Sequence, residues 1–520
     1  MLKRQWLGGL IIFILPFSAC HISPDKERQA LMDSSVYRGN LLVVKYCQSC
    51  HQLPDPALLD KKTWIKNVLP GMGPRLGVFI FKGHEYPNKV RDLNIGRKFY
   101  PAVPLVNDQQ WEDIINYYWA SAPDSLAPIQ RKEKIQSGSS LFSIQIPEKN
   151  LNVASTCMVL FDTSSKQKSI LSSTMIAPGI YRYNSQLQLL DSISTKGPVV
   201  DIIMEKKTAI ACNIGYLNPT DAKLGSIEEL KFGHKIKHKD RSIVIFDKLA
   251  RPVQVIAADL NNDKKTDYLV CEFGNNLGSL SWMENEGNNN FFKHILRSSP
   301  GSIKAYIDDY DHDGLLDIWV LFAQGDECIM LFTNRGHGQF EGKKILSFPA
   351  IYGSTYFELD DFNHDGFPDI LYSCGDNADY SPVLKPYHGI YIYLNDGKNN
   401  FKRQYFFPMH GCFKAIARDF DGDGDLDIAA ISFFPDNVHH SEEGFFYLEN
   451  TGGLQFHPYT IPGTKAGRWL TMDAGDFYGS GKPDIILGNF NLGNADSTND
   501  LQKKKSPPFI VLRNIMGHDK

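Results

Sequence analysis

From about residue 140 to its end, the chain carries short apolar runs that alternate with polar residues. This period predicts β-strands rather than helices. The runs recur in one order: an apolar run, an acidic turn, a second apolar run, a variable loop, an aromatic run ending in Asn, and a run beginning near Phe. Residues 282–291, 331–340, 393–401 and 447–456 show the second half of this unit in register. Four strands per unit in a repeating array predict a β-propeller.

Seven such units fit into residues 141–520. Two early units, near 153–195 and 199–246, have lost the acidic turn, and five later units keep it at least in part. The last unit has a third strand at Phe509–Asn514 but no fourth. The segment Phe142–Ile146 alternates as a strand. We expect it to supply the missing strand, so that the ring closes and no sheet edge stays unpaired.

The acidic turns have the chemistry of a site for a hard cation. Residues 419–427 read Asp-Phe-Asp-Gly-Asp-Gly-Asp-Leu-Asp, with carboxylates at positions 1, 3, 5 and 9 and Gly at position 6. Converging oxygens suit calcium, and the Gly is free to take the positive φ of a tight bend. An EF-hand is excluded, because no Glu stands at position 12 and strands flank the turn. A single turn of this kind would be a solvated loop, but its recurrence predicts calcium sites.

We expect three to four calcium ions. The turns at 309–317, 361–369 and 419–427 are the main sites; the turn at 259–267 lacks the Gly, and the turn at 476–484 has lost two carboxylates. The predicted ligands are Asp309, Asp311, Asp313, Asp317, Asp361, Asn363, Asp365, Asp369, Asp419, Asp421, Asp423 and Asp427, and at the fourth turn Asp259, Asn261, Asp263 and Asp267.

The turns and their flanking strands resemble the FG-GAP/VCBS repeats of integrin α-chain heads and of many exported bacterial proteins. The resemblance implies an all-β propeller. We expect the calcium ions to be structural, since each ion lets carboxylates crowd into one hairpin that would otherwise repel itself.

The first part of the chain has a helical period. Residues 108–120 predict an amphipathic helix capped by Asn107 or Asp108. Its predicted apolar face consists of Trp111, Ile114, Ile115 and Tyr118.

Upstream of this helix, residues 47–51 read Cys-Gln-Ser-Cys-His. C-x-x-C-H is the attachment sequence of one covalent haem c, in which Cys47 and Cys50 form thioethers and His51 ligates the iron. A zinc ribbon would need a second Cys/His pair nearby, and a thioredoxin-type pair would need a βαβ pattern. The surrounding sequence has neither feature.

The segment resembles class I cytochromes c, with Pro54 and Leu58 following the motif at a similar spacing. The resemblance implies a small all-α domain that is closed by the helix at 108–120. It also implies a sixth iron ligand. Met72, in a Gly/Pro-rich loop, is the first candidate and His84 is the second. A Met ligand would raise the reduction potential relative to a His pair.

The chain opens with a basic stretch, Met1–Arg4, and a short apolar run, Trp6–Phe17, and small residues then precede Cys20. This order resembles a bacterial lipoprotein signal, in which Cys20 becomes the lipidated first residue. An ordinary cleaved signal or an anchor helix is the alternative. In each case we expect an exported protein, in the periplasm or at the cell surface, with the lipid as its membrane anchor.

A chain of 520 residues is too long for one core. We therefore predict a multidomain protein: a signal at 1–20, a leader at 21–36, a small all-α cytochrome c domain at 37–125, a linker at 126–140 and an all-β, seven-bladed propeller at 141–520. The net charge of −4 argues against nucleic-acid binding. The remaining cysteines, scattered among apolar runs, are expected to be small core residues.

Loop placement predicts where a ligand would bind. If the acidic turns share one rim of the propeller, the opposite rim collects the long insertions at 213–241, 375–389, 433–444 and 488–508. Six residues near the starts of the innermost strands could ring the channel mouth and hold an anionic or sugar-like ligand. They are Lys304, Tyr356, His410, Lys414, Arg468 and Trp469. Ordinary surface positions are the alternative interpretation.

Three functions agree with this sequence. The first is an electron-transfer lipoprotein whose propeller docks a redox partner or a ligand. The second is a dehydrogenase whose propeller oxidises a sugar or an alcohol and passes electrons to the haem. The third is an adhesion or sensing module. No nucleophile–base constellation marks a catalytic site, and analogy of fold is weak support for an activity.

Overall fold

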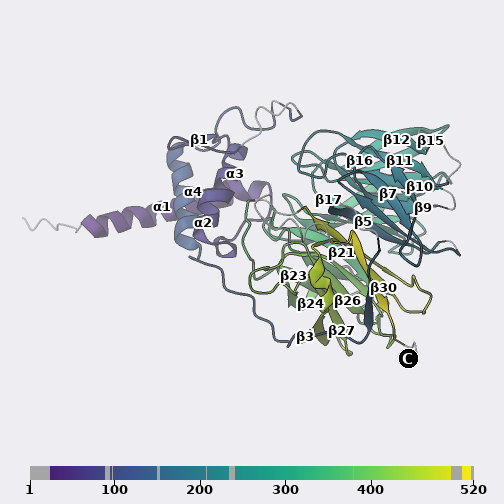
Figure 1. The fold of residues 1–520 in the computed structure, drawn as a ribbon. Coiled ribbons are helices and arrows are strands. Elements are labelled where there is room, and N and C mark those ends of the chain that lie inside the picture. The colour runs from purple at the N-terminus through teal and green to yellow at the C-terminus, as the bar shows by residue number, and fades with distance from the viewer. Residues whose placement is uncertain are drawn as a thin grey trace, which may run out of the picture.

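In the computed structural model of the chain, a mainly helical N-terminal part is joined to a ring of antiparallel sheets (Figure 1). The structure describes residues 24–87, 94–96, 98–148, 153–164, 166–205, 208–233, 241–378, 380–492 and 506–516. Cys20 and the signal-like segment lie outside these residues. Within the described ranges, no helix combines the length and apolar character needed to cross a membrane.

Two long helices organise the N-terminal part. Its elements are α1 (Pro24–Tyr46), η1 (Cys47–Ser49), η2 (Pro56–Leu58), α2 (Lys61–Thr63), η3 (Trp64–Val68), α3 (Leu69–Met72), η4 (Gly73–Leu76), β1 (Ile80–Phe81), β2 (His84–Glu85) and α4 (Asp108–Ser121). The helix predicted at 108–120 is confirmed as α4. The side chain of Asn107 caps it by accepting the Gln110 N–H, and the Gln110 side chain accepts the Asn107 N–H in return.

Residues predicted as a leader belong to helix α1, which begins at Pro24. The side chains of residues 28–34 are all exposed. A helical segment whose side chains are exposed all round needs no apolar stripe, and the sequence therefore offered no periodic signal over residues 28–34.

Helices α1 and α4 cross at a glycine. A Cβ atom on Gly39 would lie only 2.0 Å from the carbonyl oxygen of Asp113 and 2.8 Å from Cβ of Tyr117. The buried Asp113 carboxylate accepts hydrogen bonds from Ser35 Oγ at 2.5 Å and from Arg38 Nε at 2.7 Å. Burial alone would raise the pKa of Asp113, but the bonds from Arg38 and Ser35 outweigh it and lower that pKa. The hydrogen bonds from Ser35 and Arg38 to the Asp113 carboxylate thus join the two helices in addition to their apolar contact.

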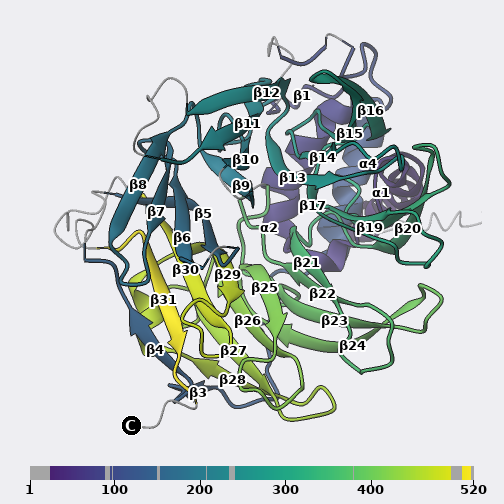
Figure 2. The same ribbon diagram turned by 90° about the vertical axis from the view of Figure 1, so that its right-hand side faces the viewer.

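Six four-stranded meanders and a seventh blade, whose outer strand comes from elsewhere in the chain, form the ring (Figure 2). The first four are β5–β8 (Ala154–Asp162, Ser169–Thr174, Gly179–Tyr183, Leu189–Ser194), β9–β12 (Val199–Met204, Thr208–Asn213, Gly225–Lys231, Ser242–Leu249), β13–β16 (Pro252–Ala258, Asp267–Glu272, Ser279–Gly287, Asn290–Arg297) and β17–β20 (Ser302–Asp308, Asp317–Phe322, Cys328–Asn334, Phe340–Ser347). The next two are β21–β24 (Ser354–Asp360, Asp369–Cys374, Gly389–Asn395, Phe401–Pro408) and β25–β28 (Cys412–Arg418, Asp427–Ser432, Phe445–Asn450, Phe456–Thr460).

The seventh sheet closes the ring as the sequence predicted. It contains β29 (Trp469–Gly475), β30 (Asp484–Asn491), β31 (Phe509–Asn514) and, as its outer strand, β4 (Phe142–Gln145). Strand β4 pairs antiparallel with β31, with Phe142 opposite Asn514. The fourth strand of the last blade therefore comes from the chain segment that precedes the first blade.

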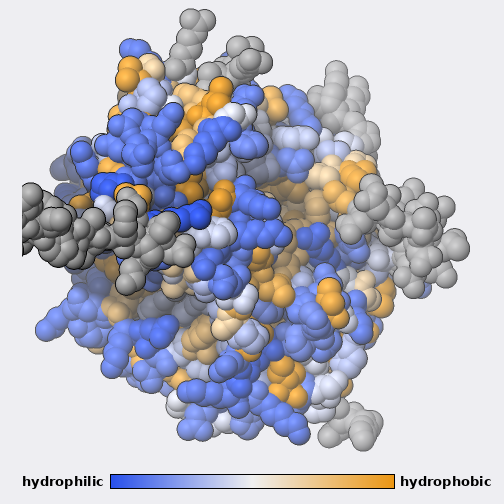
Figure 3. Space-filling model, turned by 90° about the vertical axis from the view of Figure 1, so that its left-hand side faces the viewer, coloured by the Kyte–Doolittle hydropathy of each residue, from blue (hydrophilic) through white to orange (hydrophobic). Residues whose placement is uncertain are grey.

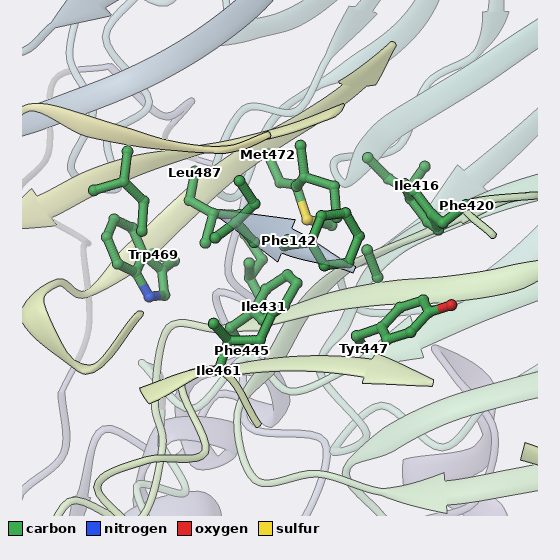
Figure 4. Close-up of a cluster of buried hydrophobic side chains, with 14 of the residues drawn as sticks. Phe142, Ile416, Phe420, Ile431, Phe445, Tyr447, Ile461, Trp469, Met472 and Leu487 are labelled. Carbon is green, nitrogen blue, oxygen red and sulfur yellow. The ribbon is translucent and has the colours of Figure 1, made fainter. Parts of the chain in front are cut away.

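The side chain of Phe142 anchors this closure in the core between the sixth and seventh blades (Figure 4). Its ring lies 5.4 Å from that of Tyr447 and 5.9 Å from that of Phe420, both in edge-on contact. The predicted linker also enters the ring, because β3 (Gln136–Ser137) adds to β28 as a parallel strand.

One predicted rim insertion contains a strand. Residues 213–241 include β11, the third strand of the second blade, which pairs with β10 and β12. The sequence Gly-Ser-Ile-Glu-Glu-Leu-Lys lacks the apolar pattern of a buried strand, because Glu228 occupies a position that is buried in the blade. This carboxylate is buried and bonds to Asn213, Ser226 and Ser242. A buried charge with local partners looks like a solvated residue in the sequence.

The scattered cysteines are core residues, as predicted. Within the described residues they are buried and unpaired: Cys157, Cys212, Cys271, Cys328, Cys374 and Cys412.

Replacing Phe142 by Ala should lower the free energy of unfolding of the propeller by about 3–5 kcal/mol, because it leaves a cavity where the ring closes. Urea denaturation monitored by tryptophan fluorescence measures this change. Phe292→Ala is the matched control, since the Phe292 side chain is 55% exposed, and we expect a change within about 0.5 kcal/mol. Equal effects of the two substitutions would contradict a closing role for β4.

Candidate functional site

The C-x-x-C-H segment lies where α1 ends and η1 begins. Cys47 is partly buried against the apolar core of the N-terminal part, Cys50 is exposed, and both thiols are free. Burial, with a smaller contribution from Cys50, raises the pKa of Cys47 to about 11. The His51 Nδ1–H donates to the carbonyl oxygen of Gln52 at 2.8 Å, because a carbonyl can only accept. This bond leaves Nε2 with its lone pair available to a metal.

The two candidates for a sixth ligand lie in different surroundings. Met72, at the end of α3, packs against the same apolar cluster as Cys47. His84 lies exposed in β2, opposite Phe81. The structure therefore places the thioether, and not the imidazole, next to the core that carries the C-x-x-C-H segment.

The acidic turns adopt one geometry at their first, third and fifth positions. The carboxylate oxygens of Asp309, Asp311 and Asp313 lie within 4.8 Å of one another, and those of Asp419, Asp421 and Asp423 do the same. The turn at 361–369 repeats the pattern of bonds from the position-5 and position-6 N–H groups to the position-1 carboxylate. Convergent oxygens in the turns at 309–317 and 419–427 are a donor set that suits a hard cation.

Position 6 needs the left-handed backbone that the sequence predicted. Gly314 and Gly366 have φ of 87° and 85°. Position 4 is left-handed as well, which the sequence did not suggest, because His312 and His364 occupy it with φ of 60° and 58°.

The turn at 259–267 keeps this backbone conformation but has Lys in place of Gly at position 6. Lys264 stands at position 6 with φ of 67°, a conformation that costs a residue with a Cβ atom. Its neighbour Lys265 places Nζ 2.8 Å from the carboxylate of Asp263. The ammonium group thus forms an ion pair with a carboxylate that was predicted to bind a metal.

The carboxylate at position 9 makes buried hydrogen bonds that the sequence did not predict. Asp427 is completely buried; its Oδ1 accepts the Asn450 N–H at 2.7 Å and its Oδ2 accepts the Phe420 N–H and the Tyr447 hydroxyl. Burial raises the pKa of Asp427 to about 7. With both oxygens already bonded, this carboxylate ties the turn to the third strand of its blade.

This hydrogen bond between the Asp at position 9 and an Asn of the third strand, which we call the Asp–Asn clasp, recurs in five blades. The Oδ1 atom of each ninth-position Asp accepts the N–H of an Asn at or near the end of the third strand, at 2.7–2.8 Å. The pairs are Asp267 with Asn285, Asp317 with Asn334, Asp369 with Asn395, Asp427 with Asn450 and Asp484 with Asn514. The sequence carried this signal as an aromatic run that always ended in Asn.

Three of the six predicted channel residues meet. Lys304, Tyr356 and Lys414 are the third residues of β17, β21 and β25. The Tyr356 ring centre lies 4.7 Å from Nζ of Lys414 and 5.7 Å from Nζ of Lys304. All three side chains are only partly buried although they belong to innermost strands.

The other three predicted residues do not join them. Trp469 is fully buried and donates from Nε1 to the carbonyl oxygen of Thr464. Arg468 donates to the carbonyl oxygen of Phe433 and stacks on the ring of that residue at 3.7 Å. His410 is 8% exposed, and burial is the main cause that lowers its pKa.

The rim predicted to be open is in part covered by the N-terminal part of the same chain (Figure 1). The Tyr387 hydroxyl donates to the carbonyl oxygen of Leu58 at 2.9 Å, and Arg75 donates to the Asn276 side chain at 2.6 Å. Ile351 and Val383 pack against the N-terminal core. The residues of this interface come from loops that join second to third strands or one blade to the next.

The face of the N-terminal part that points away from the propeller is open to solvent. Figure 3 looks onto this side of the molecule and shows hydrophobic residues scattered among hydrophilic ones. On α1, the exposed apolar side chains include Leu41 and Val44, which are 53% and 46% exposed.

Comparison with known proteins supports the repeats. Residues 259–320, 309–372 and 419–487 match the FG-GAP-like repeat, so the chain carries FG-GAP-like repeats in a β-propeller-like fold. Among solved structures, the chain is similar to streptogramin B lyase, at 11% identity over 72% of this chain and 98% of that one, with a TM-score of 0.44. It is also similar to the N-terminal domain of Nup159, at 10% identity over 74% and 98%, with a TM-score of 0.40. Similarities this weak carry no argument about activity, whereas the repeats support a docking role for a ligand or partner.

Asp427→Asn should lower the free energy of unfolding by about 2–4 kcal/mol, because an amide nitrogen would face N–H donors that a buried carboxylate satisfied. Denaturant unfolding with a chelator present separates this effect from any bound cation. Asp425→Asn, two residues earlier and partly exposed, is the control and should change stability by less than about 1 kcal/mol. A larger loss from Asp425→Asn than from Asp427→Asn would rule out the clasp.

Proposed function

We propose that the protein is an exported electron-transfer lipoprotein that binds one covalent haem c at Cys47, Cys50 and His51, and that its propeller serves as the docking module. The observation that carries this proposal is the C-x-x-C-H segment at the end of a helix, with two free thiols and an imidazole whose Nε2 is unbonded. Bound at that place, a haem would supply reversible one-electron exchange.

The surroundings fit a porphyrin. Leu41 and Val44 are exposed apolar residues in the last two turns of α1, on the approach to Cys47. An apolar macrocycle would remove these side chains from water, which is favourable at about 25 cal/mol per Å² of apolar surface. The α1–α4 crossing at Gly39 would hold the motif against the core, and the Gln52 carbonyl would keep the His51 ring in one tautomer.

Met72 is the sixth ligand that we favour over His84. Its support is the shared apolar cluster with Cys47, whereas His84 stands in an exposed hairpin. The lipid anchor at Cys20 and the export that it implies rest on the signal-like sequence alone.

A second candidate function, a dehydrogenase that delivers electrons to the haem within one chain, is favoured by one observation. The lumen group of Lys304, Tyr356 and Lys414 lies near the starts of the inner strands, which is the end of the propeller on which the N-terminal part sits. A substrate held there would lie on the haem side of the ring.

We further propose that three turns, 309–317, 361–369 and 419–427, bind structural calcium through positions 1, 3 and 5. The turn at 259–267 is excluded from this set, because Lys265 already neutralises Asp263. Position 9, which the sequence also predicted as a ligand, holds the buried bonds to the third strand, and we leave it out of the proposed set.

In a host that matures c-type cytochromes, the full chain should carry a covalent haem that is visible as Soret absorbance and as added mass after denaturation. Cys47→Ala and Cys50→Ala should each remove a thioether, and the double variant should be colourless. Ser49→Ala, exposed and inside the same motif, should keep the haem. Loss of the Met–iron charge-transfer band in Met72→Ala but not in His84→Ala would support Met72. A colourless wild-type protein would end the electron-transfer proposal.

Calcium should raise the melting temperature, and a chelator should reverse the rise. A site filled at 100 times its Kd adds about 2.7 kcal/mol. Asp423→Asn should reduce the calcium-dependent rise, whereas Asp263→Asn, at the equivalent position of the Lys-occupied turn, should leave it intact. An unchanged melting temperature with and without calcium would refute the proposal.

A further inference from the structure

Two lysines and two tyrosines from three adjacent blades form a cluster that faces the lumen of the ring. Lys304 and Tyr306 come from β17, Tyr356 from β21 and Lys414 from β25. The Lys304 ammonium lies 4.7 Å from the Tyr306 ring centre and 5.7 Å from that of Tyr356, and Lys414 reaches the same Tyr356 ring at 4.7 Å. One aromatic ring therefore has an ammonium group from each neighbouring blade beside it.

The carboxylates of the lumen are already engaged in holding adjacent blades together. Asp201 accepts the Val255 N–H at 3.0 Å from the next blade. Asp473 likewise accepts the Phe161 N–H at 2.8 Å.

Glu358 completes this set, because it accepts the Ala417 N–H of the next blade at 2.8 Å and lies 3.3 Å from Arg418. These carboxylates brace the inner strands, and their geometry is set by the backbone that they bind.

The lysines lack such partners. Within the described residues, no carboxylate lies in ion-pair contact with Lys304 or Lys414, and Lys304 makes no hydrogen bond. Lys414 donates only to the carbonyl oxygen of Met472, at 2.8 Å. Burial lowers the pKa of Lys414 to about 8, although the charges of Asp473 and Glu358, which lie near it without forming an ion pair, act in the opposite direction.

The phenol groups are bonded to each other and to the protein. The Tyr306 hydroxyl lies 3.2 Å from the Tyr356 hydroxyl and donates to the carbonyl oxygen of Phe357 at 3.0 Å. The Tyr356 hydroxyl lies 3.4 Å from Glu358. What the cluster still offers to a ligand is two ammonium groups and the faces of aromatic rings.

We propose that this lumen cluster binds a planar organic carboxylate, with Lys304 and Lys414 pairing its carboxylate groups and the Tyr356 ring stacking on its flat frame. Ammonium groups that no carboxylate contacts directly can pair with an anion, and the partly exposed Tyr356 ring favours an aromatic over a saturated ligand. The site does not require the haem, so its failure and that of the electron-transfer proposal are independent.

Isothermal titration of the full chain at pH 7 tests the site with four probes: terephthalate, benzoate, cyclohexane-1,4-dicarboxylate and inorganic phosphate. Terephthalate should bind once per chain and more tightly than each of the others. Lys304→Met and Lys414→Met should each weaken terephthalate by about tenfold or more, the loss expected for one charged contact. Tyr356→Leu should remove the preference for terephthalate over its saturated analogue.

Lys402→Met is the matched control, because Lys402 is exposed on the outer strand β24, and it should leave binding unchanged. Circular dichroism checks that each variant is folded, and the preference among the four probes is a test that needs only the wild-type protein. No binding of terephthalate, equal binding of inorganic phosphate, or terephthalate binding that survives both lysine substitutions would overturn the proposal.

Discussion

A buried carboxylate at the end of each acidic turn is the interaction on which the regular part of the propeller depends. In five blades this Asp binds the N–H of an Asn at or near the end of the third strand. The Asn side chain then continues the clasp: in Asn334 its Nδ2 donates to the carbonyl oxygen of Leu316 and to that of Leu260 in the preceding blade. A buried charge is costly unless its bonds are complete, so the clasp holds turn, third strand and neighbouring blade in one geometry.

Each acidic turn of nine residues therefore contains two kinds of carboxylate, one kind at the surface and one in the core. Positions 1, 3 and 5 of a turn lie at the surface, where their oxygens converge and are open to a cation. Position 9 lies in the core, where no cation is needed for it to be satisfied. The turn at 476–484 lacks two of the surface carboxylates, yet it remains bonded to the third strand of its blade, because Asp484 accepts a hydrogen bond from Asn514.

The N-terminal part covers some of the rim that the sequence predicted to be an open docking surface. Tyr387 and Val383 of the insertion between β22 and β23 contact Leu58 and the N-terminal core. Close to them, a Cβ on Gly71 would lie 2.8 Å from the Tyr380 ring, so helix α3, which ends at Met72, packs closely against the propeller. The N-terminal part and the propeller are thus in close contact here.

Much of this architecture could be predicted because it is local. The strand period, the recurrent turns and the Gly at position 6 follow from short-range steric and periodic rules, and they specified seven blades and the segment that closes them. The predictions failed where polar residues are buried. Glu228 hid strand β11, and the buried bonds of Asp427 to the third strand were not foreseen, because sequence does not tell a buried, bonded carboxylate from a solvated one.

The sequence by itself determined the repeat, the C-x-x-C-H motif and the residue types available for chemistry, since each depends on neighbours along the chain. Only the tertiary structure decided which of these residues meet. Lys304, Tyr356 and Lys414 gather in the lumen while Trp469, from an equivalent strand, turns into the core, and the N-terminal part settles on one rim. The physical reason is that contacts between blades and between domains are set by packing over the whole ring, and no short stretch of sequence encodes that packing.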